Sequence, residues 1–188
     1  MNVWLIYYRA IVENTRVLML LLLKQFFNIC LLNKGPQDLP GSQLLLHFTL
    51  LAYLMSGILS MLAATPLDQA LPIMLVDLCV LLLYPWLCLK AFNKSPRFLQ
   101  MMTALAGVGT LFQIVAWPLI IYMGSQQASP PPTGIMMLLM IVAWNLVVYA
   151  HIFRESFNIR LLAAYVLALT YAVISASVRQ LLFPDAGV

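Results

Sequence analysis

The chain has 188 residues, of which 63% are hydrophobic and 9% are charged. A typical soluble domain is about 45–50% apolar and about 25% charged, so this composition excludes an ordinary soluble domain and a disordered chain. Ten Lys and Arg against six Asp and Glu leave a net charge of +4. That excess is too small to follow a phosphate backbone, and we expect no nucleic-acid partner. The composition instead indicates a protein whose main partner is the lipid bilayer.

Five apolar stretches are each long enough to cross the hydrocarbon core of a membrane, which takes about 20 helical residues. Proline, glycine and charged residues separate the stretches. They predict an all-α polytopic membrane bundle with spans near residues 44–64, 72–92, 99–123, 135–153 and 161–183. Residues 35–188 then form the five-span transmembrane domain, and residues 1–34 form a separate N-terminal segment.

The basic residues give the expected orientation, because Lys and Arg collect in cytoplasmic loops. With five spans, nine of the ten basic residues fall on one side, and the loops on the other side carry no Lys or Arg. The nine are Arg9, Arg16, Lys24, Lys34, Lys90, Lys94, Arg97, Arg154 and Arg160. We therefore expect the N-terminus in the cytoplasm and the C-terminus outside.

The N-terminal segment contains the apolar run Val17–Leu23, which mimics a signal peptide but is followed by no small-x-small cleavage site. Most of the polar residues between Arg9 and Asn28 fall within about half of a helical wheel. We expect an amphipathic helix that lies in the cytoplasmic interface. The alternative is a helix packed under the bundle. Gly35-Pro36 should end this helix, and Ser42 or Asp38 should cap the next one.

Asp77 and Arg179 fall within predicted spans, where charge is expensive and each such group is a candidate site. Asp77 lies five residues into the second span, and Arg179 lies four residues before the end of the fifth. The two residues should lie at similar depth from the same face of the membrane. We expect a structural ion pair between them. The alternative is that Asp77 faces a wet cavity, where it would exchange protons or meet a cation.

Neutral polar residues within the spans predict a polar core. Thr110 and Gln113 belong to a heptad-spaced stripe on the third span, and Asn145 lies in the middle of the fourth. Such side chains form hydrogen bonds between helices in a membrane.

Small residues predict where the helices pack closely. Ala164, Ala168, Ala172 and Ala176 form an i, i+4 ridge on the fifth span, and Gly107 and Gly109 thin the third. We therefore expect the core around the third and fifth spans, although part of the small-residue surface would equally serve a second subunit.

No motif for catalysis or for cofactor binding occurs in the sequence, such as GxSxG, HExxH, a P-loop or GxGxxG. His47 and His151 have no Cys, His or carboxylate at ligand spacing on their own helices, and the three cysteines have no zinc-like spacing. We therefore expect neither an enzyme nor a metal or cofactor site.

The topology and one junction resemble a known family. Before the first span the chain reads Lys34-Gly35-Pro36-Gln37-Asp38-Leu39-Pro40. Its Gly-Pro and Asp-Leu elements are similar to the Asp-Leu-Tyr-Gly-Pro junction of eukaryotic members of the Yip (Ypt-interacting protein) domain superfamily, in reversed order and without the Tyr. With its five spans, the chain resembles a small bacterial member of that superfamily. The resemblance implies a protein of the bacterial inner membrane that organises membranes or trafficking through binding partners, without catalysis.

Two functions from different classes follow from these features. The first is a non-enzymatic organising or accessory subunit that contacts another membrane protein, or itself, through small-residue faces and the N-terminal helix. The alternative is a small proton- or solute-coupled transporter that uses Asp77, Gln113 and Asn145 around a cavity near the middle of the membrane. Whether Asp77 lines water distinguishes them.

Overall fold

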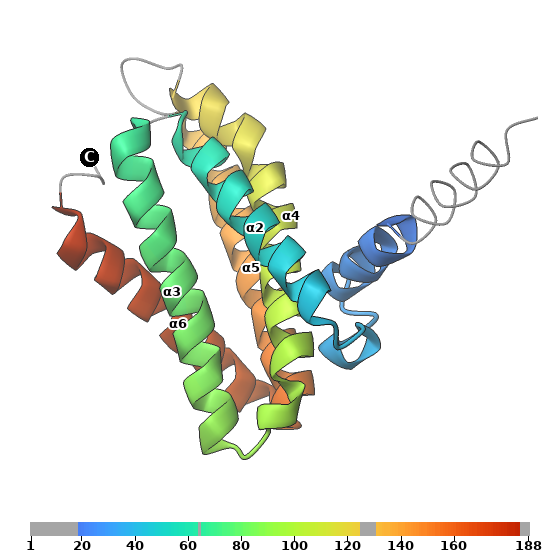
Figure 1. Cartoon of the computed structure of the whole chain (residues 1–188). Coiled ribbons are helices and arrows are strands. Elements are labelled where there is room, and N and C mark those ends of the chain that lie inside the picture. Colours follow the sequence, from blue (N-terminus) through green and yellow to red (C-terminus); the bar gives the residue numbers. More distant parts are fainter. Residues whose placement is uncertain (1–18, 64, 125–130, 185–188) are drawn as a thin grey trace, which may run out of the picture.

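Five long apolar helices follow one another in the computed structural model, which describes residues 19–63, 65–124 and 131–184 (Figure 1). They are α2 (Gln43–Met61), α3 (Leu67–Ala91), α4 (Phe98–Gly124), α5 (Pro132–Phe157) and α6 (Leu161–Leu182). A shorter helix, Met19–Cys30, precedes them, and the 3-10 turns η1 (Pro36–Asp38) and η2 (Ser95–Arg97) lie in connections. No strand occurs in these ranges. The predicted all-α bundle with five membrane-spanning helices is confirmed.

Two of the helices extend beyond the apolar stretches that predict them. α3 begins five residues early, at Leu67 after the N-cap Pro66, and includes Pro72 as its sixth residue, where the missing N–H removes one backbone hydrogen bond. α5 begins at Pro132 and continues through Arg154 and Glu155 before Asn158, in the left-handed conformation with φ 57°, ends it. Apolar length therefore marks what crosses the bilayer, whereas caps and prolines mark where each helix ends.

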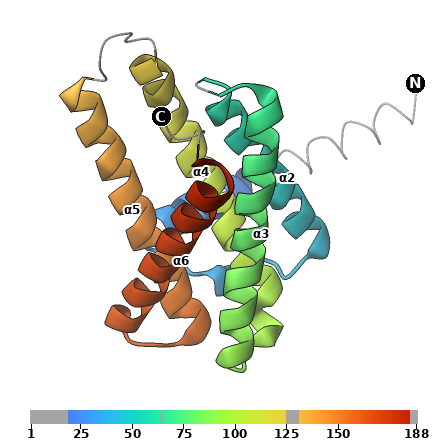
Figure 2. The ribbon, with the colours of Figure 1, turned by 90° about the vertical axis from the view of Figure 1, so that its left-hand side faces the viewer.

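α4 lies at the centre of the bundle and packs against α2, α5 and α3 (Figure 2). Its residues from Met101 to Gly109 are all buried. The bundle has two ends. The basic end holds the α3–α4 and α5–α6 connections with Lys94, Arg97 and Arg160, and the far end holds the α2–α3 and α4–α5 connections. The prediction that the third span forms the core is confirmed.

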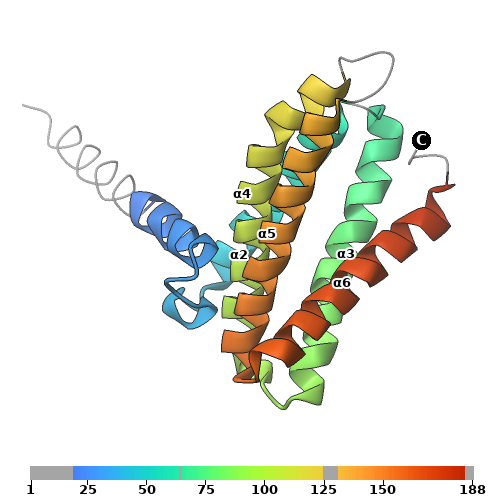
Figure 3. The same ribbon diagram turned by 180° about the vertical axis from the view of Figure 1, so that it is seen from behind.

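α6 contributes to the core only along its first half, so that part of the prediction is confirmed only in part. The helix starts beside α5 at the basic end and runs diagonally towards α3 (Figures 2 and 3). Ala164 and Ala168 are fully buried, but Ala172 and Ala176 are exposed. Ala172 and Ala176 are exposed because α6 runs diagonally, so the second half of the alanine ridge no longer faces the bundle.

The N-terminal helix Met19–Cys30 packs against the side of the bundle through Phe26 and Ile29, and the rest of it points away (Figures 1 and 3). Phe26 lies over Gly107 of α4, where an added Cβ would overlap the phenyl ring. The indole Nε1 of Trp144 donates a 3.2 Å hydrogen bond to the Cys30 carbonyl. The expected position in the membrane interface stays a prediction, and the part of its polar face between Arg9 and Arg16 lies outside the described residues.

The segment Gly35–Ser42, which we call the elbow, joins this helix to α2. Asp38 Oδ2 accepts a 3.0 Å hydrogen bond from the Gly35 amide and closes the 3-10 turn. Ser42 Oγ accepts from the Leu45 amide at 3.4 Å, so Ser42, rather than Asp38, is the N-cap of α2.

We expect Gly107→Ala to destabilise the packing of the N-terminal helix. The new Cβ would overlap Phe26, so the ring must move, at a cost of about 1–3 kcal/mol. The thermal unfolding of the full chain in detergent measures this loss. Gly41→Ala is the matched control, because a Cβ at Gly41 meets its nearest atom, Gln100 Cγ, at 4.0 Å. Equal unfolding temperatures for the two variants would contradict the role of Gly107.

Candidate functional site

The carboxylate of Asp77 joins three helices. Asp77 lies on α3, and its Oδ2 accepts a 2.5 Å hydrogen bond from the hydroxyl of Tyr53 on α2. Its Oδ1 accepts a 2.6 Å hydrogen bond from the hydroxyl of Ser175 on α6. A carboxylate away from bulk water needs donors to replace its hydration, and these two hydroxyls supply one to each oxygen.

Asp77 and Arg179 do not form the expected ion pair, and that prediction is wrong. In residues 19–63, 65–124 and 131–184, the only ion pair within 4.0 Å joins Arg154 to Glu155. Neutral hydroxyls already occupy both oxygens of Asp77, and the Arg179 side chain is exposed. A long arginine side chain near a helix end can reach the polar boundary of the membrane and leave the carboxylate behind.

Asp77 and Arg179 nevertheless lie beside the same cavity. This far-end cavity has a volume of about 210 Å³ between α2, α3, α4 and α6. A single water needs only about 10–15 Å³ on this scale, so the space admits several waters or a small polar group. Its polar lining consists of Ser60, Asp77, Gln113 and Arg179, and its apolar lining consists of Gly57, Met61, Ile73 and Met74.

The predicted polar core of Thr110, Gln113 and Asn145 is only partly assembled. Gln113 Oε1 accepts a hydrogen bond from the Ser56 hydroxyl, and the Gln113 carbonyl accepts one from Ser60 at 3.4 Å. Thr110 instead donates to Ala106 of its own helix at 2.8 Å, a common way for a helical Thr to satisfy its hydroxyl. The side chain of Asn145 has no hydrogen bond to any described residue, so it does not join Gln113.

Tyrosine side chains occupy the bundle beside Asp77. The rings of Tyr149 and Tyr171 have centroids 5.6 Å apart, and Tyr171 and Tyr84 are separated by 5.8 Å. Tyr149 donates to the Leu105 carbonyl at 3.3 Å. Tyr53, Tyr149 and Tyr171 are all buried. Gly109 makes room for them, because a Cβ there would lie 2.6 Å from Tyr53 Cε2.

Tyr53 and Ser175 are the site residues that sequence reasoning missed. A tyrosine in the middle of a span is a usable signal, since its hydroxyl needs a partner when it is buried. Ser175 lies one helical turn before Arg179, on the same face of α6. The spacing of the polar residues therefore indicates that Ser175 and Arg179 share a face of α6. Only the packing of α6 on α3 shows that Asp77 is the acceptor for Ser175.

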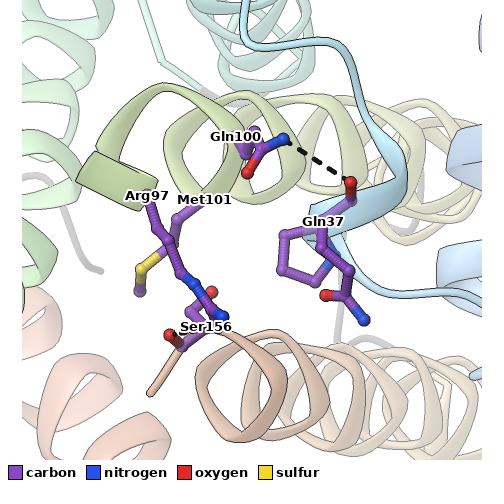
Figure 4. A pocket seen from close by; sticks show the side chains of 6 residues that line it. Gln37, Arg97, Gln100, Met101 and Ser156 are labelled. Atoms are coloured by element: carbon purple, nitrogen blue, oxygen red, sulfur yellow. Dashed lines mark hydrogen bonds between the residues drawn. The ribbon is translucent and has the colours of Figure 1, made fainter. Parts of the chain in front are cut away.

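A second polar cluster holds the elbow against α4 and α5 (Figure 4). Gln100 Nε2 donates to the Leu39 carbonyl at 3.0 Å, and His151 Nε2 lies 2.9 Å from the Lys34 carbonyl. Arg97 Nη1 donates to the carbonyls of Glu155 and Ser156 at 2.9 and 3.0 Å, near the C-terminus of α5. The crevice between these side chains has no room for a water-sized ligand. The cluster therefore has a structural role, which is to hold the elbow against α4 and α5.

No group of three or more His, Cys, Asp or Glu that could hold a metal ion occurs in the described part of the chain. Burial raises the pKa of the Cys30 thiol to about 11, which keeps this sulfur protonated and unreactive at neutral pH. The chemistry that the described residues offer is thus concentrated in the far-end cavity.

We expect Tyr53→Phe and Ser175→Ala each to destabilise the bundle. Either change leaves one oxygen of Asp77 without its donor, at a cost of about 1–3 kcal/mol. Thermal unfolding in detergent measures the effect. Tyr165→Phe is the control, because the Tyr165 hydroxyl has no hydrogen bond to a described residue. An unfolding temperature for Tyr53→Phe equal to that of the control would show that the Asp77 contact contributes nothing.

Comparison with known proteins gives no relative for this arrangement. No family model, no curated protein and no solved structure matches the chain. The fold is an all-α helical bundle with five helices that can span a membrane.

Proposed function

We propose that the protein is a non-enzymatic integral membrane protein of Yip-like type that acts through helix–helix contacts as an organising or accessory subunit. The proposal includes the bacterial inner membrane as its location, with the basic end in the cytoplasm. Lys94, Arg97 and Arg160 at one end of the bundle support this orientation, because basic residues remain on the cytoplasmic side. The Yip resemblance rests on the five spans and on the Gly35-Pro36 and Asp38-Leu39 elements before the first of them, which stand in the reverse of the family's order.

The observation that carries the proposal is the alanine ridge on α6. Ala164 and Ala168 are buried within the bundle, whereas Ala172 and Ala176 continue the same face into the open. α6 is also the span with the smallest buried share, 17% of its most apolar window. Small residues let a second helix approach closely, and van der Waals packing is the main force between helices in lipid. The exposed half of the ridge therefore suits a helix of another subunit.

The N-terminal helix supports the same function. Phe26, Ile29 and the Trp144–Cys30 hydrogen bond fix one end of it on the bundle. Apolar side chains away from this contact are exposed, among them Leu20, Leu23 and Phe27. A helix that is held firmly at one end and presents apolar surface elsewhere suits contact with lipid or with a partner helix.

We expect Ala172→Leu with Ala176→Leu to disrupt assembly. The added side chains would keep a partner helix from approaching α6, while the bundle itself should stay folded because both positions are exposed. The measurements are the native mass of the tagged chain in mild detergent and the recovery of co-purifying membrane proteins. At least a tenfold drop in the recovered complex is expected.

The matched control for this experiment is Ala163→Leu. Ala163 is also exposed and lies nine residues before Ala172, which places it on the opposite face of the same helix. It introduces the same side chain into the same span and should leave assembly intact. If the double variant and the control both keep the wild-type native mass and the same partners, α6 is not the contact face.

A transporter is the second candidate, and one observation favours it: Asp77 and Gln113 line the same cavity. Asn145, the third residue of that hypothesis, is not among the lining residues. An intramembrane carboxylate beside a polar cavity is a usual feature of proton-coupled carriers. Tyr53, Tyr149 and Tyr171 are buried in the bundle next to Asp77, so a path from the cavity to the basic end would require these side chains to move.

If the protein carries protons, Asp77→Asn should abolish the flux. Proteoliposomes that contain the full chain and a pH-sensitive dye would report proton movement after a pH jump. Asp68→Asn is the control, because Asp68 is an exposed carboxylate of the same helix outside the cavity lining. Flux that persists unchanged in Asp77→Asn, or no flux in wild type, would reject this candidate.

A further inference from the structure

The far-end cavity contains opposite charges that do not neutralise each other. Asp77 and Arg179 both line it, yet they form no ion pair within 4.0 Å. The side chain of Arg179 has no hydrogen bond to a described residue. Ionisable groups in a membrane usually pair with one another or face a polar cavity, because an unmatched charge is expensive there. Two opposite charges that line one cavity without pairing leave room for a ligand that contacts both.

The two sides of the cavity offer different recognition chemistry. The guanidinium of Arg179 presents only donors, in a fork that suits a phosphate or a carboxylate. Asp77 presents only acceptors, and each of its oxygens has accepted a single hydrogen bond, so lone pairs remain. The lining therefore attracts an anion at Arg179 and an ammonium group at Asp77.

The remaining lining residues suit the part of a ligand that would connect its ammonium group to its anionic group. Met61, Ile73 and Met74 supply an apolar wall, and Ser60 and Gln113 supply neutral polar groups. A volume of about 210 Å³ is far more than one water needs and fits a group of several heavy atoms. A short methylene chain with an ammonium at one end and an oxyanion at the other matches this distribution.

We propose that the far-end cavity binds a small zwitterionic group, with its ammonium beside Asp77 and its phosphate or carboxylate beside Arg179. Two sources share this chemistry: the headgroup of a phosphatidylethanolamine lipid and a free zwitterion such as an amino acid. Arg179 lies three residues before the end of α6, about 5 Å along the helix. That position places it near the depth of lipid headgroups.

The inference is separate from the contact face on α6 and does not require it. If the protein is a transporter, the inference names the class of ligand that it carries. Only the claim of transport then rests on the transporter candidate, and the claim of binding does not. Binding and flux are measured separately. Binding of the zwitterionic group without flux would support the binding site and reject the transporter candidate.

The test measures binding to the purified, delipidated full chain by isothermal titration calorimetry. The lipid probes are dihexanoyl phosphatidylethanolamine and dihexanoyl phosphatidylglycerol, which has the phosphate but lacks the ammonium. The free probes are phosphoethanolamine and glycine. We expect the zwitterionic lipid or a free zwitterion to bind at least tenfold more tightly than phosphatidylglycerol. Binding by the lipid alone identifies the headgroup as the source, and binding by the free probes alone identifies a soluble ligand.

Three variants locate the site. Arg179→Gln should weaken binding at least tenfold, and it should fold, because this exposed side chain makes no contact that holds the bundle together. Asp77→Asn should remove the preference for an ammonium group. Asp68→Asn, on the same helix but outside the cavity, should bind as wild type does. No binding of any probe, binding of phosphatidylglycerol as tight as that of every zwitterionic probe, or wild-type binding by Arg179→Gln would overturn the proposal.

Discussion

The arrangement of the helices depends on one carboxylate in the interior of a membrane protein. Asp77 receives a hydroxyl from Tyr53 on α2 and another from Ser175 on α6, so a residue of α3 fixes both neighbours. The two hydroxyls replace hydration that the carboxylate loses within a span, so moving either donor away would cost free energy. This requirement explains why α6 leaves α5 and crosses to α3, even though the path carries half of its alanine ridge out of the core.

Close packing on α4 makes that contact reachable. Gly109 lets Tyr53 lie directly against the α4 backbone, and two residues earlier Gly107 gives the same room to Phe26 of the N-terminal helix. The two glycines therefore accommodate different neighbours on nearly opposite faces of one helix. One allows the tyrosine to reach Asp77, and the other seats the only described segment that points away from the bundle. Hydrophobic burial alone would not distinguish these positions from the rest of the buried run between Met101 and Gly109.

Much of the fold could be predicted from sequence because it follows from local properties. Apolar length locates the five helices, Ser42 caps α2 as the pattern indicates, and the small residues of the third span place it at the centre. Contacts between helices were predicted less well, since a periodic pattern defines a face but not the helix that it meets. Arg179 shares a cavity with Asp77, as their similar depth suggests, but two neutral hydroxyls satisfy the carboxylate. Asn145 lies on α5, where no described residue forms a hydrogen bond with its side chain.

The two proposed surfaces share one helix, and their positions on it have a consequence. Ser175, which holds α6 to Asp77, lies between Ala172 and Ala176 in the chain, and Arg179 follows one turn later. A group that binds between Asp77 and Arg179 would therefore act on the helix segment that presents the exposed alanines. Because linked binding events influence each other by equal free energies, a helix docked on Ala172 and Ala176 would in turn alter the affinity of the cavity. The coupling needs no long pathway, since a single span carries both surfaces and the Ser175 hydroxyl joins that span to Asp77 between them.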